Sequence, residues 1–433
     1  MANDKNFKVK NALEIGKSLK TSLGTVTSSN IDLSTGNYFK DTTNTTTYTI
    51  SNPSPAQSFQ LELTGGNADV VSNFKNLSYT GTGSAQTLTT GFDLATDGGM
   101  IWTKWRNATL GSANHNLVDT VRGANKSVAT NDNGAQSTAS SISGFTSTGY
   151  TLAAANGPGG ATNYNNAQYV SWTWKRATKF FDVVTYTGDG NAGKTVNHNL
   201  GSVPGMILFK RTDDAANWAT YHNSLNGGTN PHEYLIKINQ TGYEADNATF
   251  LNDTAPTSTQ FTLGTTSLVN ANGGSYVAYL FGHETGSDSM IKCGYFLNNQ
   301  ASQDVEVNIG FKPQWLLLKG ASAGSGLGNW HIYDNLDVRA GKQLEPNSSD
   351  GDANGFITFT TNGFTPSTYY GGNLIYVAIR EAGDPAITWP GTVKWPGGIT
   401  PTAPGIGETD LYTFTTDDSG SSYYGYLSGD NLS

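Results

Sequence analysis

The sequence has one cysteine and few charged residues, and each shortage excludes a class of protein. Because Cys293 stands alone among 433 residues, it can form neither an internal disulfide nor a cysteine-rich zinc site. Charged residues make up 14% of the chain, against roughly 25% in an average soluble protein. With a net charge of −9, the chain offers no basic face to nucleic acid or to an anionic lipid surface.

Long hydrophobic stretches are lacking as well. The longest apolar runs, such as Trp315–Leu318, fall far short of the ~20 residues that a membrane-spanning helix needs, so no membrane insertion is expected. The N-terminus reads MANDKNFKVKNALEIG and has no apolar region of the kind found in Sec-type signal peptides. Packing, sheet hydrogen bonds or oligomerisation must therefore stabilise the protein.

What the chain does contain is material for strands and turns. It holds 52 glycines together with many Thr, Ser and Asn, and 11% of its residues are aromatic. Aromatic and β-branched clusters separated by turn residues are typical of an all-β protein with many short strands. A chain of this length has room for about two to four domains with buried cores.

One unit of about 105 residues is written three times. The copies begin at Tyr79, Tyr186 and Tyr295, which lie 107 and 109 residues apart. A strongly apolar strand follows at a similar distance in each copy, over Met100–Trp105, Met206–Arg211 and Trp315–Gly320. Because several features keep this order, we predict three tandem β-sandwich repeats, over 67–180, 181–288 and 289–384.

Further signals recur inside the copies. The last two copies share a Trp-x-x-Tyr pair, Trp218 with Tyr221 and Trp330 with Tyr333, where the first copy reads NHNLVD. Each copy closes on an aromatic strand, over 169–176, 276–284 and 375–381. We expect the apolar strands to be buried, each within its own repeat, and the repeats to form a stiff rod or a lobed projection.

The stretch TGDGNAGKT in the second copy matches the phosphate-binding pattern G-x-x-x-x-G-K-[ST] at Gly188, Gly193, Lys194 and Thr195. A genuine P-loop is followed by a helix whose N-terminus holds the phosphates. Here VNHNLGSVPG follows, and its Asn, Gly and Pro residues break a helix. We therefore interpret the match as a solvent-facing hairpin turn in which glycine supplies a positive φ.

Two segments outside the repeats have the period of half-buried strands. Apolar residues alternate with polar ones at Phe59, Leu61 and Leu63, and again at Tyr412 and Phe414. Neither segment alone carries enough strands to bury a face. We predict that 30–66 and 385–433 form one small discontinuous β-sandwich, with the repeats inserted at an exposed glycine-rich loop. Residues 1–29 are predicted to be an N-terminal docking arm.

These segments resemble a known class of protein. The phrases STGNYF, TYTISNP, SFQLELTGG, ITWPGTVKWPGG and DLYTFTTDDSGSSYYGYLSG resemble the two halves of a β module found in virion proteins of tailed phages, especially marine cyanophages. The repeat phrase YTGDGNAGKTVNHNLGSVPGMILFKR is similar to a repeat of the same structural proteins. The resemblance implies a location in the virion and assembly with other virion proteins, and it favours a trimer.

A catalytic site is not predicted. A glycosidase needs two carboxylates roughly 5–10 Å apart, and none of the candidate carboxylates recurs in all three copies: Asp213, Asp214, Glu233, Asp334 and Asp337. The histidines show no spacing typical of metal ligands on one element: His115, His198, His222, His232, His283 and His331. No cofactor, metal or catalytic residue is therefore assigned.

Two weaker binding hypotheses stay open. The oxygen-rich turns 131–134 and 349–355 suit calcium, although each lacks the distal glutamate of a complete calcium loop. Trp218, Tyr221, Trp330 and Tyr333 have the chemistry to stack on sugar rings, but their recurrence favours a place in the core.

The combined reading is a non-enzymatic structural component of a phage virion. A tail fibre or receptor-binding adhesin that contacts a host surface glycan is favoured. The alternatives are a capsid decoration or head-fibre protein and, from another class, a tailspike enzyme that depolymerises glycans.

Overall fold

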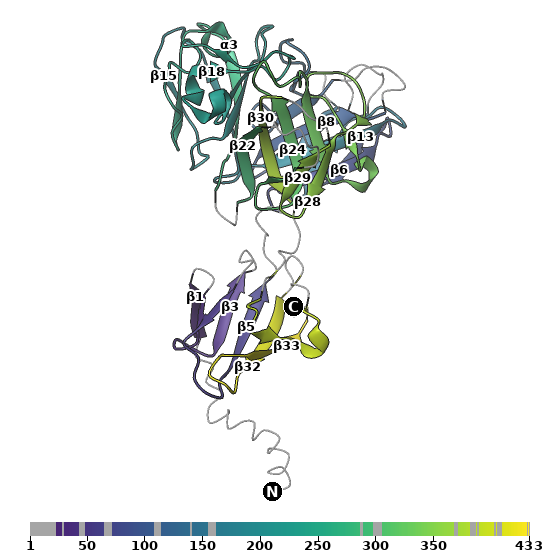
Figure 1. The fold of residues 1–433 in the computed structure, drawn as a ribbon. Coiled ribbons are helices and arrows are strands. Elements are labelled where there is room, and N and C mark those ends of the chain that lie inside the picture. Colours follow the sequence, from purple (N-terminus) through teal and green to yellow (C-terminus); the bar gives the residue numbers. More distant parts are fainter. Residues whose placement is uncertain are drawn as a thin grey trace. The chain divides into compact units, whose positions relative to one another are not determined.

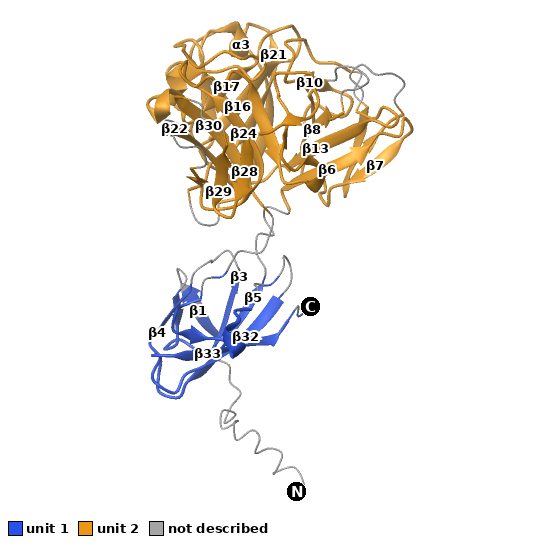
Figure 2. Cartoon of the chain, turned by 45° about the vertical axis from the view of Figure 1, so that its right-hand side comes forward, with its two compact units in different colours: residues 1–69, 382–433 blue, residues 70–381 orange. Residues whose placement is uncertain are grey.

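The computed structural model describes residues 23–27, 30–42, 48–64, 72–107, 114–138, 141–154, 162–285, 289–297, 305–367, 371–381, 387, 389–401, 404, 409–430 and 432. The chain divides into two compact units, coloured separately in Figure 2. Unit 1 comprises 1–69 and 382–433, and unit 2 comprises 70–381. The fold is all-β, with a small discontinuous β-sandwich that carries three inserted repeats.

Unit 1 is built from both ends of the chain (Figure 1). Its strands are β1 (Leu23–Thr27), β2 (Asn30–Asp32), β3 (Tyr38–Thr42), β4 (Thr49–Ser51), β5 (Ser58–Thr64), β31 (Val393–Lys394), β32 (Thr409–Thr415) and β33 (Tyr423–Gly429). They follow the order β31-β33-β32-β5-β3-β1-β2-β4. β1 connects the two parts of this strand order, because its first residues pair with β3 and its last residues pair with β2.

The two halves of unit 1 meet at β5 and β32, which pair antiparallel with Leu61 opposite Tyr412. The alternation predicted from the sequence is present, since every second residue of β5 and of β32 is buried. The ring of Phe59 stacks on Phe414 at 4.8 Å between centroids. Trp389 packs on the same core and lies 5.7 Å from Tyr48. The predicted common core of the two segments is confirmed.

One boundary differs from the prediction. β1 falls inside the range 1–29 that the sequence indicated as a docking arm, yet it is an internal strand of the unit 1 sheet. Its pairing with β3 and β2 depends on neighbours distant in sequence, which periodicity within 1–29 does not reveal. Residues 1–22 of the arm lie outside the described residues.

Unit 2 contains the three repeats. Repeat 1 has β6 (Phe74–Thr80), β7 (Gln86–Thr89), β8 (Gly99–Trp105), β9 (Asn116–Asp119), β10 (Ser127–Ala129), β11 (Ile142–Thr146), β12 (Gly149–Leu152) and β13 (Gln168–Lys175). Repeat 2 has β14 (Phe181–Thr187), β15 (Lys194–Asn197), β16 (Met206–Arg211), β17 (Ala219–His222), η3 (Leu225–Gly228), η4 (Pro231–Glu233), β18 (Tyr234–Leu235), β19 (Ala245–Asp246), β20 (Gln260–Leu263), α3 (Ser267–Asn270) and β21 (Ser275–Phe281). Repeat 3 has β22 (Ile291–Leu297), β23 (Val307–Asn308), β24 (Pro313–Gly320), β25 (Trp330–Asp334), η5 (Asp337–Arg339), β26 (Lys342–Gln343), β27 (Ala353–Asn354), β28 (Ile357–Thr360), β29 (Gly363–Pro366) and β30 (Asn373–Arg380).

The repeats share one plan. In the larger sheet of each, the first strand pairs with the last, the last with the apolar strand, and the apolar strand with the one that follows it: β6-β13-β8-β9, β14-β21-β16-β17 and β22-β30-β24-β25. In repeat 1, β10 extends the larger sheet and the order β11-β12-β7 makes a smaller one. The remaining strands form two small sheets in each of the others, β15-β20 and β18-β19 in repeat 2, and β23-β29-β28 and β26-β27 in repeat 3. This common register makes positions in the three repeats directly comparable.

The larger sheets are buried on both faces, which is why their strands read as continuous apolar runs. In β16, Ile207 and Phe209 pack in a core within repeat 2, whereas Met206 and Leu208 face a second core. That second core is common to all three repeats, and we call it the central core. Trp174 of repeat 1 lies in it, 5.3 Å from Trp315 and 6.1 Å from Phe281 between ring centroids.

The central core corrects the expectation that each apolar strand is buried within its own repeat and that the repeats make a rod. Half of each strand's side chains pack against the other two repeats. Figure 1 shows β8 and β13 close to β24 and β30, although these pairs are far apart in the sequence. The three repeats therefore form one cluster around a shared interior.

Candidate functional site

Each repeat places a lysine at the same position of its apolar strand. Lys104, Lys210 and Lys319 are buried, with at most 1% of each residue exposed. Each ammonium group donates to a backbone carbonyl in the preceding repeat, with repeat 3 preceding repeat 1. The bonds run from Lys104 to Ser349 (2.7 Å), from Lys210 to Asn133 (3.1 Å) and from Lys319 to Thr241 (3.1 Å). The repeats therefore close into a ring, whose three junctions we call seams.

Burial shapes the electrostatics of these lysines. Removal of the ammonium from water lowers the pKa of Lys104, of Lys210 and of Lys319 to about 8. Charge-assisted hydrogen bonds offset part of the cost of burial, since Lys210 also donates to the carbonyl of Ala216 at 2.8 Å and Lys319 to that of Gly328 at 2.5 Å.

Two further contacts recur at the seams. Backbone N–H groups at 136, 244 and 352, which are 108 residues apart, donate to the next repeat: Gln136 to Thr212 (2.9 Å), Glu244 to Ala321 (2.9 Å) and Asp352 to Arg106 (2.7 Å). The indole N–H groups of Trp218 and Trp330 donate to the carbonyls of Ala129 and Lys237 at 2.9 and 3.0 Å. Trp330 pairs with Lys319 in the strand register. His115 takes the equivalent place in repeat 1, because His115 and Trp218 each directly precede the strand that pairs with the apolar strand of their repeat.

A third recurrent position lies at the end of the fourth strand. Asp119, His222 and Asp334 occupy it, opposite Met100, Met206 and Trp315. Each bonds to the last strand of the following repeat. Tyr279 donates to Asp119 (2.9 Å), His222 to the Tyr376 carbonyl (3.0 Å) and Trp172 to Asp334 (3.0 Å). Burial lowers the pKa of His222 to about 4, so the neutral ring is the bonded form.

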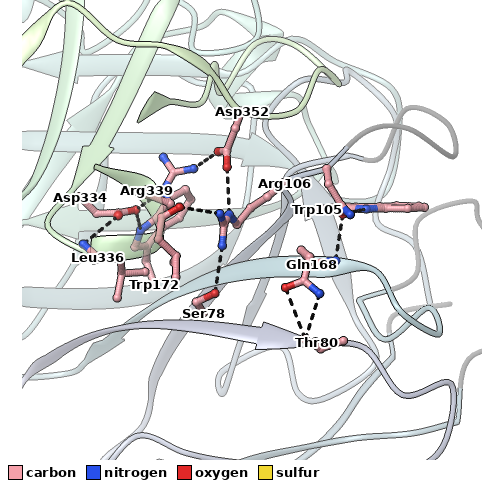
Figure 3. Close-up of polar contacts among 12 residues, drawn as sticks. Ser78, Thr80, Trp105, Arg106, Gln168, Trp172, Asp334, Leu336, Arg339 and Asp352 are labelled. Atoms are coloured by element: carbon pink, nitrogen blue, oxygen red, sulfur yellow. Dashed lines mark hydrogen bonds and ion pairs between the residues drawn. The ribbon is translucent and has the colours of Figure 1, made fainter. Parts of the chain in front are cut away.

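The seam between repeats 3 and 1 closes the ring without a direct peptide connection inside unit 2. Arg106 of repeat 1 holds Asp352 at 2.9 Å and also donates to the carbonyl of Val338 at 2.8 Å (Figure 3). Asp352 also accepts from Arg339, whose Nε lies 2.8 Å from Asp334. The Arg339 guanidinium stands 6.0 Å from the ring of Trp172. These arginine and aspartate side chains, alternating in charge, bond repeat 3 to repeat 1.

Asp334 is committed to this seam. Burial raises the pKa of its carboxyl group, and the nearby Arg339 partly offsets that effect. Its Oδ2 accepts from both Arg339 and Trp172, and its Oδ1 accepts from the Leu336 N–H at 3.3 Å. Three donors therefore fix the orientation of this carboxyl group.

A pocket of about 230 Å³ adjoins the closing seam in repeat 3. Its walls come from the end of β25, from η5 and β26, and from β28. Asp334 and Asp337 both line it, so the structure brings together two of the carboxylates considered from the sequence. The others lie elsewhere: Asp213 and Asp214 pair with Arg211 on the surface, and Glu233 ends η4.

The oxygen-rich turns considered for calcium hold a different cation. The carbonyls of Asn133 and Ser349, one in each turn, accept from Lys210 and Lys104. Among the described residues there is no group of three or more His, Cys, Asp or Glu able to hold a metal ion. One carbonyl of each turn is thus bonded to a lysine ammonium group.

The recurrent aromatic residues lie in the core, as their recurrence indicates. At most 3% of Trp218, Tyr221, Trp330 or Tyr333 is exposed, so their rings are not available to sugars. The histidines do not converge on one site. His222 aligns with Asp334, whereas His331 pairs with Leu318 in another register.

The P-loop match leads into β15, not into a helix. Gly190 and Gly193 have φ of +75° and +87°, which agrees with the predicted role of glycine in a turn. The hairpin interpretation is wrong, because β14 pairs with β21 and β15 with β20 in a different sheet. The turn carries the chain from one layer of the sandwich to the other, and Lys194 lies 3.6 Å from Asp189 within it.

Sequence reasoning missed the seam residues, although a signal was present. The apolar strands read WTKW, LFKR and LLKG, with a lysine at the same place in each. A charge inside three equivalent apolar runs indicates a buried partner in each copy. Arg106, Arg122 and Arg339 had no such recurrent signal.

The fold and its seams define an all-β protein in which a closed ring of three repeats is inserted into a split sandwich. The chain belongs to the family described as Domain of unknown function (DUF7483), whose model matches residues 69–383, close to the limits of unit 2. No curated protein matches the chain.

Among solved structures, the chain is similar to the one titled "Crystal Structure of the STIV MCP", with 7% identity over 75% of this chain and 92% of that chain. The TM-score of 0.15 is too low for this likeness to carry an argument.

Within the described ranges, none of the helices has the length and apolar character needed to pass through a membrane.

Proposed function

We propose that the protein is a non-enzymatic structural component of a phage virion and acts as a tail fibre or receptor-binding adhesin. Two lines of reasoning support this proposal. The first is the resemblance of the split domain and of the repeats to tailed-phage virion proteins. The second is that the charged and histidine side chains of the ring join one repeat to the next.

The proposal rests mainly on one observation: the buried charged and histidine side chains at the seams bond to one another and to neighbouring repeats. Asp334, Arg339 and Asp352 bond to one another and to Trp172. The neutral His222 is fixed by two backbone partners, the Tyr376 carbonyl and the Ser224 N–H. Catalysis needs such groups poised beside a substrate, whereas here they join repeat to repeat. This arrangement suits a mechanical scaffold.

The two units suit a division of labour. Unit 1, which combines 1–69 with 382–433, is proposed to dock on other virion proteins. The ring is proposed to present the host-contacting surface. Assembly as a homo-oligomer, with a trimer favoured, completes the proposal.

Two experiments test the proposed function. Antibody label on intact virions is expected on the tail, and label confined to the head would instead favour a decoration or head-fibre role. Incubation of the pure protein with host envelope polysaccharide is expected to give binding without release of reducing ends. Release of reducing ends would identify a depolymerase and overturn the non-enzymatic proposal.

A further inference from the structure

We propose that the pocket beside the closing seam binds a single sugar residue of a glycan. The inference rests on the proposed adhesin function and names the site through which it would act. The pocket is formed where β25 turns through η5 into β26, and β28 supplies the opposite wall.

The pocket presents two oppositely charged side chains. Asp337 lines it and is exposed, and no side-chain partner is found for its carboxylate among the described residues. The ammonium group of Lys342 holds the side-chain oxygen of Asn354 at 2.8 Å, an exposed contact. One strong acceptor and one cationic donor therefore line the same small space.

Apolar surface faces the same space. Phe359 is half-buried on β28, and Ile357 and Leu336 line the pocket with it. A sugar ring combines these two demands, because its hydroxyl groups donate to a carboxylate and accept from an ammonium while its C–H face packs on an aromatic ring. A purely apolar ligand would leave the Asp337 carboxylate desolvated without compensation.

The size of the pocket sets the extent of the ligand. Its volume of about 230 Å³ lies below the roughly 300–1,000 Å³ of sites that enclose drug-sized molecules. One sugar ring is the matching unit, and the rest of a glycan would extend into solvent.

The seam holds the pocket in shape. In repeat 1 the arginine that pairs with the recurrent aspartate follows three residues later, as Arg122 follows Asp119. In repeat 3 the pair is Asp334 and Arg339, five residues apart, and the longer segment forms η5 with Asp337 at its start. Arg339, fixed at both aspartates of the seam, anchors the other end of η5. The backbone of η5 is therefore anchored on both sides of Asp337, by the Leu336 N–H and by Arg339, so the pocket wall is formed before any ligand arrives.

The test is ligand-observed saturation-transfer NMR on the full-length protein, with methyl glycosides of glucose, galactose, mannose and N-acetylglucosamine as probes. At least one glycoside is expected to receive saturation from the wild type. The Asp337→Ala variant is expected to lose that signal at least tenfold. Asp246→Ala, which removes an exposed carboxylate on β19 in repeat 2, is the matched control and is expected to bind like the wild type.

Because Asp337 is exposed, Asp337→Ala is expected to keep the wild-type thermal unfolding curve, which confirms that any loss of binding is local. Undiminished binding by this variant would overturn the pocket while leaving an adhesin role intact. The absence of saturation transfer to every glycoside would also overturn the pocket. Label on the virion tail in that case would show that the proposed function stands without it.

Discussion

Replacement of Asp352 by alanine should weaken unit 2 more than replacement of its counterpart at any other seam. Asp352 balances two arginines, with Arg106 at 2.9 Å and Arg339 on its other oxygen. The Arg339 side chain is fully buried, and in the variant it keeps only Asp334 as its carboxylate partner. Removal of one partner of a buried ion pair costs about 3–5 kcal/mol. Because 15% of the Asp352 side chain is exposed and Asp334 remains, we expect about 3 kcal/mol.

Gln136→Ala is the matched control, since position 136 is the equivalent of 352 in the seam between repeats 1 and 2. Both residues donate their backbone N–H across a seam, and alanine preserves that bond. Gln136 contributes one neutral side-chain acceptor to the Arg122 guanidinium at 3.1 Å, so its loss should cost about 1.5 kcal/mol, at the lower end for a bond to a charged group. Urea unfolding of both variants at pH 7 measures the difference. Equal losses, or a loss below about 1 kcal/mol for Asp352→Ala, would refute a charge-locked closing seam.

Three further predictions concern other parts of the molecule. The pKa of about 8 for Lys104, Lys210 and Lys319 lies below the unfolded value, so the unfolded chain binds more protons above pH 8 and stability should rise with pH from 8 to 9. Each lysine contributes up to about 1.4 kcal/mol per pH unit to the free energy of unfolding, and Lys319→Met should remove the contribution of one lysine. A free energy of unfolding in urea that does not change between pH 8 and 9 would contradict the burial of the amines. Replacement of Lys194 and Thr195 by alanine should leave the thermal unfolding temperature unchanged with or without ATP, and ATP-dependent stabilisation of the wild type that is lost in the double variant would reinstate the P-loop. Deletion of 67–384 with Gly66 joined to Pro385 should leave a folded β protein, because β5 and β32 share one core; a disordered amide spectrum would show that unit 1 needs its insert.

Local sequence patterns were sufficient to predict which segments form strands and which of their residues are buried. Period-2 alternation predicted β5 and β32, and the requirement that each buries a face predicted their common core. Recurrence of Trp218 and Trp330 predicted burial because equivalent positions in repeats share a packing role. These inferences succeed because the period of a strand and the burial of one face are properties of a short segment.

The arrangement of the repeats could not be predicted in the same way. An apolar strand that is covered on both faces has the same sequence pattern whether its second face is covered by the same repeat or by another repeat. β8, β16 and β24 therefore predicted burial but not the central core. The site was hidden for a related reason. Arg106 and Asp352 are 246 residues apart, and no pattern within either repeat indicates that they meet.

The central claim is that the three repeats close into a ring around one shared core, and hydrogen–deuterium exchange of two neighbouring variants tests it most directly. Leu208 faces the central core and Ile207, beside it in β16, faces the core of repeat 2 alone. Each change to alanine should cost about 2–5 kcal/mol. Leu208→Ala should accelerate amide exchange in β8 and β24 as well as in β16, whereas Ile207→Ala should accelerate exchange in β15, β16 and β20 and leave β8 and β24 protected. If Leu208→Ala affected repeat 2 alone, the repeats would be independent units and the ring would be wrong.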